Sequence, residues 1–133
     1  MASSNPPHVW AILDEGVLRR EIGGSQVMYN QLAKLLPLVD TPTSKVQVLP
    51  YNHGAHPFLG GSMTLLKLSG GREVAYEEGI DVGRLYEDSG QVERRKRVYD
   101  ELRAHALSPR ESAALIRKLM EEYKSSCEPH DQT

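Results

Sequence analysis

The sequence has almost no cysteine and no long apolar run, and each absence excludes a class of protein. Cys127 is the only cysteine, so an intrachain disulfide cannot form and a reducing compartment fits best. No stretch approaches the roughly 18 apolar residues of a membrane span, and the first residues lack the basic and apolar parts of a signal peptide. We therefore expect a cytoplasmic protein that is not inserted in a membrane.

The chain also lacks an excess of charge of either sign. It has 16 Lys and Arg residues and 18 Asp and Glu residues, for a formal net charge of -2, whereas nucleic-acid-binding domains are usually strongly basic. The one basic cluster, Glu93–Arg97, spreads around most of the circumference of a helix, so it cannot form a single stripe along a phosphate backbone. We expect a solvated helix face there and no direct contact with nucleic acid.

The length of 133 residues is that of one domain with a real hydrophobic core. Both ends are polar and contain proline, so they cannot bury enough apolar surface to offset the cost of ordering. We predict a single domain over residues 9–124, flanked by disordered residues 1–8 and 125–133.

The first half of the chain predicts two parallel strands joined by a helix. Residues 8–14 form a short apolar run that is typical of a central strand buried on both faces. Apolar residues then recur at helical spacing after Ser25, which we expect to be the N-cap, until Pro37 ends the helix. Residues 41–44 are predicted as a loop and residues 46–49 as a second strand, parallel to the first.

The second half predicts a hairpin, a last short strand and two helices. Strands at 62–68 and 73–78 flank a glycine pair, and residues 82–86 form another strand. One helix begins near residue 88, and Ser108 with Glu111 predicts a capping box at the start of the other. The order β-α-β-β-β-β-α-α predicts an α+β fold, with helices packed on a small mixed β-sheet.

Many separate stretches occur in the order of one known family. They are Leu13–Arg20, Ile22–Gly24, Gln31–Leu32, Val46–Pro50, Gly54–Pro57, Gly60–Gly61, Thr64–Leu66, Val74–Glu78, Leu85–Asp88 and Ala106–Ser112. This ordered set resembles the uncharacterised, antitoxin-like C-terminal domain that follows an Xre-type helix-turn-helix in regulators of Streptomyces and other actinobacteria, and the resemblance covers about residues 9–123.

The resemblance implies a sensing role. In such regulators the N-terminal helical module binds DNA, and the C-terminal domain is thought to sense a ligand or a small protein. About eight residues precede the first predicted strand here, whereas a helix-turn-helix needs two helices and their turn. We therefore expect a stand-alone effector domain that does not itself bind DNA.

The glycine-containing loop after the second strand is the richest candidate site. It contains His53 and His56 in an H-x-x-H spacing, and imidazoles near neutrality can transfer protons or contact a ligand. Two loop histidines without a cysteine pair or a placed third ligand are a weak metal signal, so we expect no metal. The His56-Pro57 pair belongs to the family pattern, which leaves a structural anchor and a ligand contact as alternatives for His56.

Carboxylates end the first strand. Asp14 and Glu15 lie there with Arg19 about one helical turn onward. They could bind a cationic group or relay a proton, and the alternative is an internal salt bridge that fixes the turn after the strand.

The hairpin and the last strand supply the remaining candidates. Tyr76 and Glu78 share one face of their strand, with Glu77 on the other. That pair is functional if its face lines a cavity and is ordinary surface if it faces water. The expected binding residues are His53, His56, Arg19, Glu15 and Tyr86.

Two functions fit these features. The first is a cytoplasmic module that binds a small molecule, a short peptide or a small protein, as a homodimer that covers an exposed sheet edge. The alternative is a small cofactor-free tailoring enzyme of natural-product biosynthesis that promotes cyclisation, cross-linking or conjugate addition. Its catalytic groups would be His56, Glu78, Asp14 and Tyr76. Neither function needs a cofactor, and no dinucleotide, P-loop or nucleophile-elbow motif is present.

Overall fold

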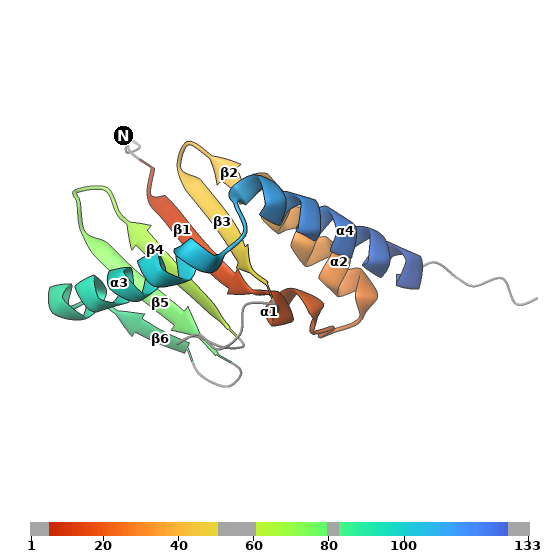
Figure 1. Ribbon diagram of the computed structural model, residues 1–133, viewed down its shortest axis with the longest axis horizontal. Coiled ribbons are helices and arrows are strands. Elements are labelled where there is room, and N and C mark those ends of the chain that lie inside the picture. Colours follow the sequence, from red (N-terminus) through yellow and green to blue (C-terminus); the bar gives the residue numbers. More distant parts are fainter. Residues whose placement is uncertain (1–5, 51–60, 80–82, 128–133) are drawn as a thin grey trace, which may run out of the picture.

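The protein folds into a mixed six-stranded sheet with four helices packed on it (Figure 1). The computed structural model describes residues 6–50, 61–79 and 83–127. The strand order is β2-β3-β1-β4-β5-β6. The predicted α+β class is confirmed.

The first strand lies in the middle of the sheet. β1 (His8–Asp14) pairs in parallel with β3 (Ser44–Leu49) and antiparallel with β4 (Ser62–Lys67). Both the central position of β1 and its parallel pairing are as predicted. The connection between the parallel strands runs through α2 (Ser25–Leu35) and the 3-10 helix η1 (Leu36–Leu38), so the helix ends just before Pro37 as expected.

The other half of the sheet is antiparallel. β4 and β5 (Glu73–Glu78) form the predicted hairpin, and β6 (Gly83–Tyr86) pairs with β5 along the edge. The turn between β4 and β5 contains Gly70 and Gly71 at φ angles of 89° and 86°. Glycine adopts this left-handed region without the steric cost that a side chain adds.

Two short elements are absent from the predicted order. α1 (Glu15–Arg19) begins directly after β1, and β2 (Asp40–Thr41) pairs with the start of β3. The prediction of a loop over residues 41–44 was therefore wrong at both ends. Elements of two and five residues are too short to show a periodicity.

The predicted N-cap of α2 was also wrong. The cap position is Gly24, at a φ of 95°, and no side chain caps the helix there. Ser25 is already the first helical residue, and its hydroxyl donates to Glu21 at 2.9 Å.

The two long helices begin where the sequence predicts. α3 (Ser89–His105) is capped by Asp88, and α4 (Pro109–Cys127) follows the predicted capping box. The Ser108 hydroxyl accepts from the Glu111 amide at 3.0 Å, and the Glu111 carboxylate accepts from the Ser108 amide at 2.9 Å. α4 continues to Cys127, so the expected start of the tail at residue 125 falls inside this helix.

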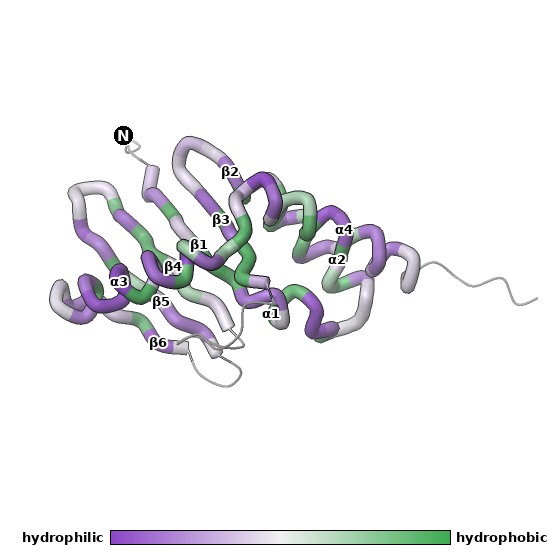
Figure 2. The backbone as a smooth tube through the Cα atoms, in the orientation of Figure 1, coloured by the Kyte–Doolittle hydropathy of each residue, from purple (hydrophilic) through white to green (hydrophobic). Residues whose placement is uncertain are grey.

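The helices cover opposite faces of the sheet. Ala11 of β1 packs with α1, α2 and α4, whereas the next residue, Ile12, packs with α3, as the alternation of a strand requires. In Figure 1, α2 and α4 run side by side at one end of the molecule, and α3 crosses the sheet. Figure 2 shows hydrophobic segments on the strands and on α2 and α4, whereas α3 is mostly hydrophilic.

The segment between α3 and α4 is attached to β3. The Leu107 amide donates to the Val48 carbonyl at 2.8 Å, and the Val48 amide donates to the Ser112 hydroxyl at 2.9 Å. Gln47 donates from its side chain to the Leu107 carbonyl at 3.0 Å. Because Ser112 is completely buried, these bonds fix where α3 ends and α4 begins.

Over the part of the chain that the structure describes, every helix is too short or too polar to span a membrane.

Candidate functional site

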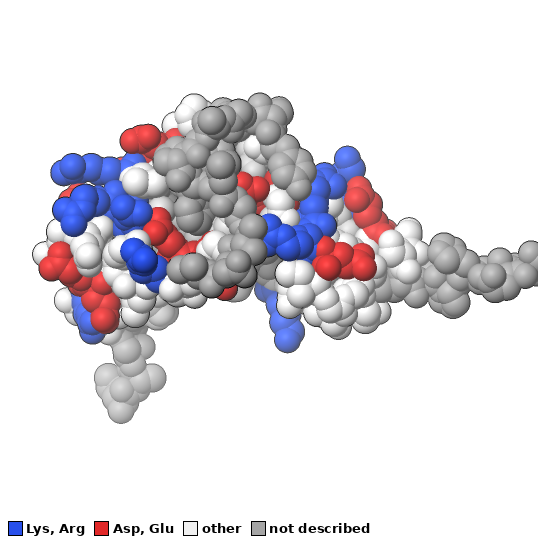
Figure 3. Space-filling model, turned by 90° about the horizontal axis from the view of Figure 1, so that it is seen from below, with Lys and Arg blue, Asp and Glu red and all other residues white. Residues whose placement is uncertain are grey.

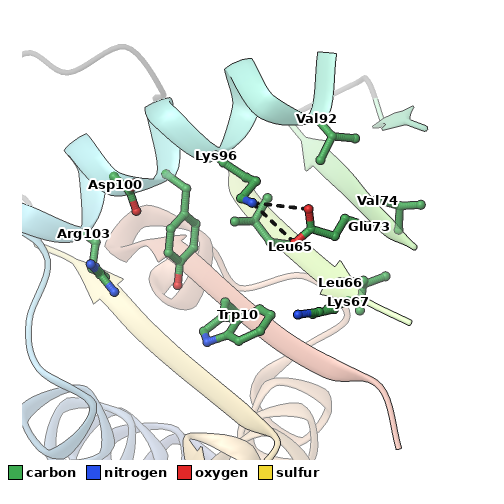
Figure 4. Close-up of a pocket in the computed structure, with 11 residues that line it drawn as sticks. Trp10, Leu65, Leu66, Lys67, Glu73, Val74, Val92, Lys96, Asp100 and Arg103 are labelled. Carbon is green, nitrogen blue, oxygen red and sulfur yellow. Dashed lines mark hydrogen bonds and ion pairs between the residues drawn. The ribbon is translucent and has the colours of Figure 1, made fainter. Parts of the chain in front are cut away.

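A pocket of about 330 Å³ lies between α3 and the sheet (Figure 4). Its size is at the lower end of the range of small-molecule sites, about 300–1,000 Å³. Four elements contribute the lining residues, which are Trp10 of β1, Leu65, Leu66 and Lys67 of β4, Glu73 and Val74 of β5, and Val92, Lys96, Tyr99, Asp100 and Arg103 of α3.

Two ion pairs hold α3 over this part of the sheet. Lys96 contacts the carboxylate of Glu73 at 3.3 Å, and Arg95 contacts the carboxylate of Glu77 at 2.8 Å. Figure 4 shows the Lys96 side chain reaching from α3 to Glu73 on β5 across the pocket wall. Both glutamates lie on the same face of β5, since they are four residues apart in a strand.

Tyr99 brings an unsatisfied polar group to the pocket. Its side chain is only 3% exposed, and its buried hydroxyl has no hydrogen-bond partner among the described residues. Buried polar groups are rarely left unpaired because each lost hydrogen bond costs about 1–3 kcal/mol. Because Tyr99 also lines the pocket, this unpaired polar group lies close to it.

The hydroxyl of Tyr99 remains protonated at neutral pH. Burial raises its pKa from 10.0 to about 12, an effect that nearby Arg103 opposes and nearby Asp100 reinforces. A neutral phenol can donate one hydrogen bond to an acceptor on a ligand. Tyr99 therefore adds no charge to the surroundings of the pocket.

A second, more open hollow of about 470 Å³ adjoins the pocket and shares Trp10 and Lys67 with it. The His8 ring stacks on the Trp10 ring with 5.7 Å between centroids and forms part of its wall. Lys67 is exposed and has no ion-pair partner among the described residues. A free cation therefore stands at the boundary of the two hollows.

The basic cluster on α3 is only partly solvated. Glu93, Arg94 and Arg97 are exposed as expected, but Arg95 and Lys96 are half-buried in ion pairs with the sheet. The expectation of a solvated face was wrong for these two residues because they point toward β5. On the face in Figure 3, basic and acidic side chains lie next to one another among the described residues.

Tyr86, one of the expected binding residues, belongs to an internal cluster. Its hydroxyl donates to the Glu77 carboxylate at 2.9 Å, and the Arg95 guanidinium lies 5.1 Å from the centre of its ring. The Nε atom of Arg95 is buried without a hydrogen-bond partner among the described residues. This cluster joins α3 to β5 and β6 and forms no part of the pocket lining.

The carboxylates after β1 have structural contacts. Asp14 accepts from the Gly16 amide at 2.8 Å and so caps α1, and Glu15 forms a salt bridge with Arg19 at 2.5 Å. Arg19 also lies 3.9 Å from Glu122 of α4. This is the internal salt bridge given above as the alternative to a binding role.

Tyr76 and Glu78 lie on the sheet face opposite to α3. Glu77 between them points toward α3, so alternation directs its two neighbours away. Glu78 is exposed and Tyr76 is half-buried over Gly83, where a side-chain carbon would lie 2.3 Å from the Tyr76 hydroxyl. Neither residue lines the pocket beneath α3.

The two histidines of the H-x-x-H loop, His53 and His56, lie outside the described residues. Within residues 6–50, 61–79 and 83–127, no group of three or more His, Cys, Asp or Glu side chains could hold a metal ion.

Sequence reasoning missed Trp10, Lys67 and Tyr99 as site residues. It placed Trp10 in a buried strand and Tyr99 on the apolar face of a helix, where both appear as core residues. The only available signal was a tyrosine in a buried helix position, since a buried hydroxyl needs a partner. Lys67 lies near Trp10 and Tyr99 only because β1 and β4 pair, and the sequence does not specify that pairing.

Comparison with known protein families identifies a match over most of the chain. A family model described as "Domain of unknown function (DUF5753)" matches residues 1–118. No curated protein and no solved structure matches.

Proposed function

The chain belongs to the DUF5753 family, a domain of unknown function, and we propose that it acts as a ligand-binding effector domain. Its ligand occupies the pocket beneath α3. The observation that carries this proposal is the pocket of about 330 Å³ itself, which apolar side chains of the sheet and of α3 line beside the unpaired hydroxyl of Tyr99.

The ordered stretches shared with the effector domains of actinobacterial Xre-type regulators support a sensing role within this proposal. In this role the domain does not itself read DNA. The basic cluster of α3 agrees with that view. Its residues Arg95 and Lys96 form ion pairs with the sheet carboxylates of Glu77 and Glu73. They are less available for phosphate groups than free cations.

The placement of the pocket provides a means of signalling. A ligand there contacts α3 and three strands at once, so its binding energy adds to the ion pairs that hold α3 on the sheet. The expected consequence is a more firmly docked α3, whose outer face a small protein partner could recognise.

We retain the homodimer as part of the proposal. β6 is the last strand of the sheet, and among the described residues it pairs only with β5. Leu85 in this strand is 55% exposed, and edge strands of this kind often pair with a second copy. Light scattering on the purified chain tests this directly, and a monomeric mass at the highest soluble concentration would reject it.

We rank ligand binding ahead of the tailoring-enzyme alternative. Of the four proposed catalytic residues, Tyr76 and Glu78 lie on the face opposite to α3, and Asp14 caps α1. None of these three lines the pocket. Catalysis there would need groups other than those, and general acid-base chemistry requires its residues within reach of one substrate.

A neutral fluorescent probe tests the binding site. N-phenyl-1-naphthylamine becomes bright in apolar surroundings, and we expect it to bind the chain with one-to-one stoichiometry. Leu65→Phe adds a ring within the pocket lining and should abolish most of this signal. Leu38→Phe makes the same change at an exposed site of η1 and should leave the signal unchanged.

Circular dichroism and melting curves should show that both variants fold. Equal probe binding by folded Leu65→Phe and by the unaltered chain would place the binding site elsewhere. Absence of probe binding to the unaltered chain would count against an apolar ligand site of any kind.

A further inference from the structure

We propose that the ligand of this pocket is a small aromatic anion, whose ring system lies against Trp10 and Leu65 and whose negative group binds Lys67. This inference rests on the proposed ligand-binding function and specifies its chemistry. Trp10, Leu65 and Lys67 come from two neighbouring strands and face the same side of the sheet.

Register places the ring site next to the cation. Trp10 pairs with Leu65 across β1 and β4, and His8 pairs with Lys67 one step further along the same two strands. All four residues have the same parity in their strands, so their side chains project from the α3 face. Figure 4 shows Trp10 and Lys67 as neighbours at the edge of the pocket.

The aromatic part of the ligand follows from the walls. Trp10 offers a ring face that already stacks with His8, and Leu65 and Val92 supply further apolar surface. Aromatic rings prefer offset stacking and edge contacts with such rings, worth about 0.5–1.5 kcal/mol beyond the area that they bury. A flat ring system fits the space between a helix and a sheet.

The negative charge follows from the balance of the rim. Glu73 is the acidic residue nearest in register to Lys67, and its carboxylate is engaged by Lys96. Lys67 and Arg103 have no ion-pair partner among the described residues. Of the two acidic lining residues, only Asp100 likewise has no ion-pair partner there. The rim therefore has a surplus of free positive charge.

Lys67 is the better of the two cations for this role. It is exposed and borders both the pocket and the adjoining hollow, so an anionic group bound there can remain partly hydrated while the rings lie against Trp10 and Leu65. Charge-assisted bonds to Lys67 add affinity without burying the charge completely.

Three probes of one shape test this inference. They are biphenyl-4-carboxylate, its neutral carboxamide and the cationic 4-phenylbenzylamine. Trp10 is the only tryptophan of the chain, so protein labelled with 5-fluorotryptophan gives a single fluorine resonance from the site itself. Titrations followed by this resonance yield three dissociation constants for the same residue.

We expect the carboxylate to bind about ten-fold more tightly than the carboxamide, with the amine weakest. Lys67→Gln should remove the preference for the carboxylate and leave the carboxamide affinity unchanged. Lys34→Gln, at an exposed position of α2, should preserve the preference. Added salt should reduce the preference, since the charge at Lys67 is exposed to solvent.

The outcomes separate the two proposals. Equal affinity for all three probes, or a preference that survives Lys67→Gln, would overturn the anionic ligand class and leave the binding function in place. A fluorine resonance that none of the three probes shifts would overturn the pocket as a site for aromatic ligands and this inference with it.

Discussion

Tyr99 and Tyr123 are both buried tyrosines, but only one of their hydroxyl groups has a hydrogen-bond partner among the described residues. The Tyr123 hydroxyl donates to the Leu18 carbonyl at 2.8 Å, whereas the Tyr99 hydroxyl has no partner among the described residues. We expect Tyr99→Phe to stabilise the free protein by roughly 1 kcal/mol and Tyr123→Phe to destabilise it by a similar amount. Urea unfolding of both variants measures this, and a destabilised Tyr99→Phe would show that the hydroxyl is satisfied in the free protein.

Alkaline pH tests the same hydroxyl through its ionisation. The pKa of Tyr99 is raised from 10.0 to about 12 in the folded state, mainly by burial. A raised folded-state pKa means that the folded form holds the proton more tightly, so this stability is fully present below pH 10 and is lost between pH 10 and 12. Tyr99→Phe should show a smaller loss over that interval in urea unfolding curves, and identical losses would contradict the assignment.

At the scale of elements, the capping box of α4 is the clearest test. Ser108→Ala removes the acceptor of the Glu111 amide and should destabilise the fold by about 1 kcal/mol. Ser125→Ala changes an exposed serine at the other end of the same helix and should have little effect. Thermal unfolding compares the two variants, and equal melting temperatures would show that the box does not contribute.

Acid pH tests the other partner of the box. Hydrogen bonds from the Ser108 amide and hydroxyl lower the pKa of Glu111. A lowered folded-state pKa means that the stabilisation is present above the unfolded-state value and is lost as pH falls through the folded-state value. Glu111→Gln should therefore remove part of the acid dependence of the melting temperature below about pH 5.

Elements with strong local signals were predictable from the sequence, and the others were not. β1, the β4–β5 hairpin and the starts of α3 and α4 follow from apolar periodicity, a glycine pair and capping residues. α1 and β2 are too short for periodicity, and their existence depends on the Asp14 cap and on pairing with β3. Ser25 does not cap α2 because it is the first residue of the helix and its hydroxyl donates to Glu21, four residues earlier in the chain.

For the molecule as a whole, the two-sided packing predicts an order of amide protection. β1 lies between two paired strands and contributes Ala11 and Ile12 to the separate cores on its two faces. We expect its amides to exchange with solvent most slowly, and those of the edge strands β2 and β6 to exchange fastest. Hydrogen exchange followed by mass spectrometry tests this, and fast exchange in β1 would contradict the central position.

The candidate site depends on how whole elements assemble, so most of it could not be predicted from the sequence. Asp14, Glu15, Tyr76 and Glu78 were chosen for their chemistry, but strand direction and alternation place them at a cap, in a salt bridge or on the face away from α3. Trp10, Lys67 and Tyr99 come together only when β1, β4 and α3 assemble. The residues next to each of them in the sequence do not indicate that the three side chains lie close together in space.

The central place of β1 affects how the protein is made. β1 precedes its partners β3 and β4 in the chain, and the bond from Tyr123 to Leu18 spans 105 residues. During synthesis β1 therefore has no strand partner until β3 and β4 follow, and the α4 part of its core is added only after residue 109. Translation that stops before α4 would release a fragment with the α2 side of its core uncovered, and such a fragment is a natural client for chaperones or proteases.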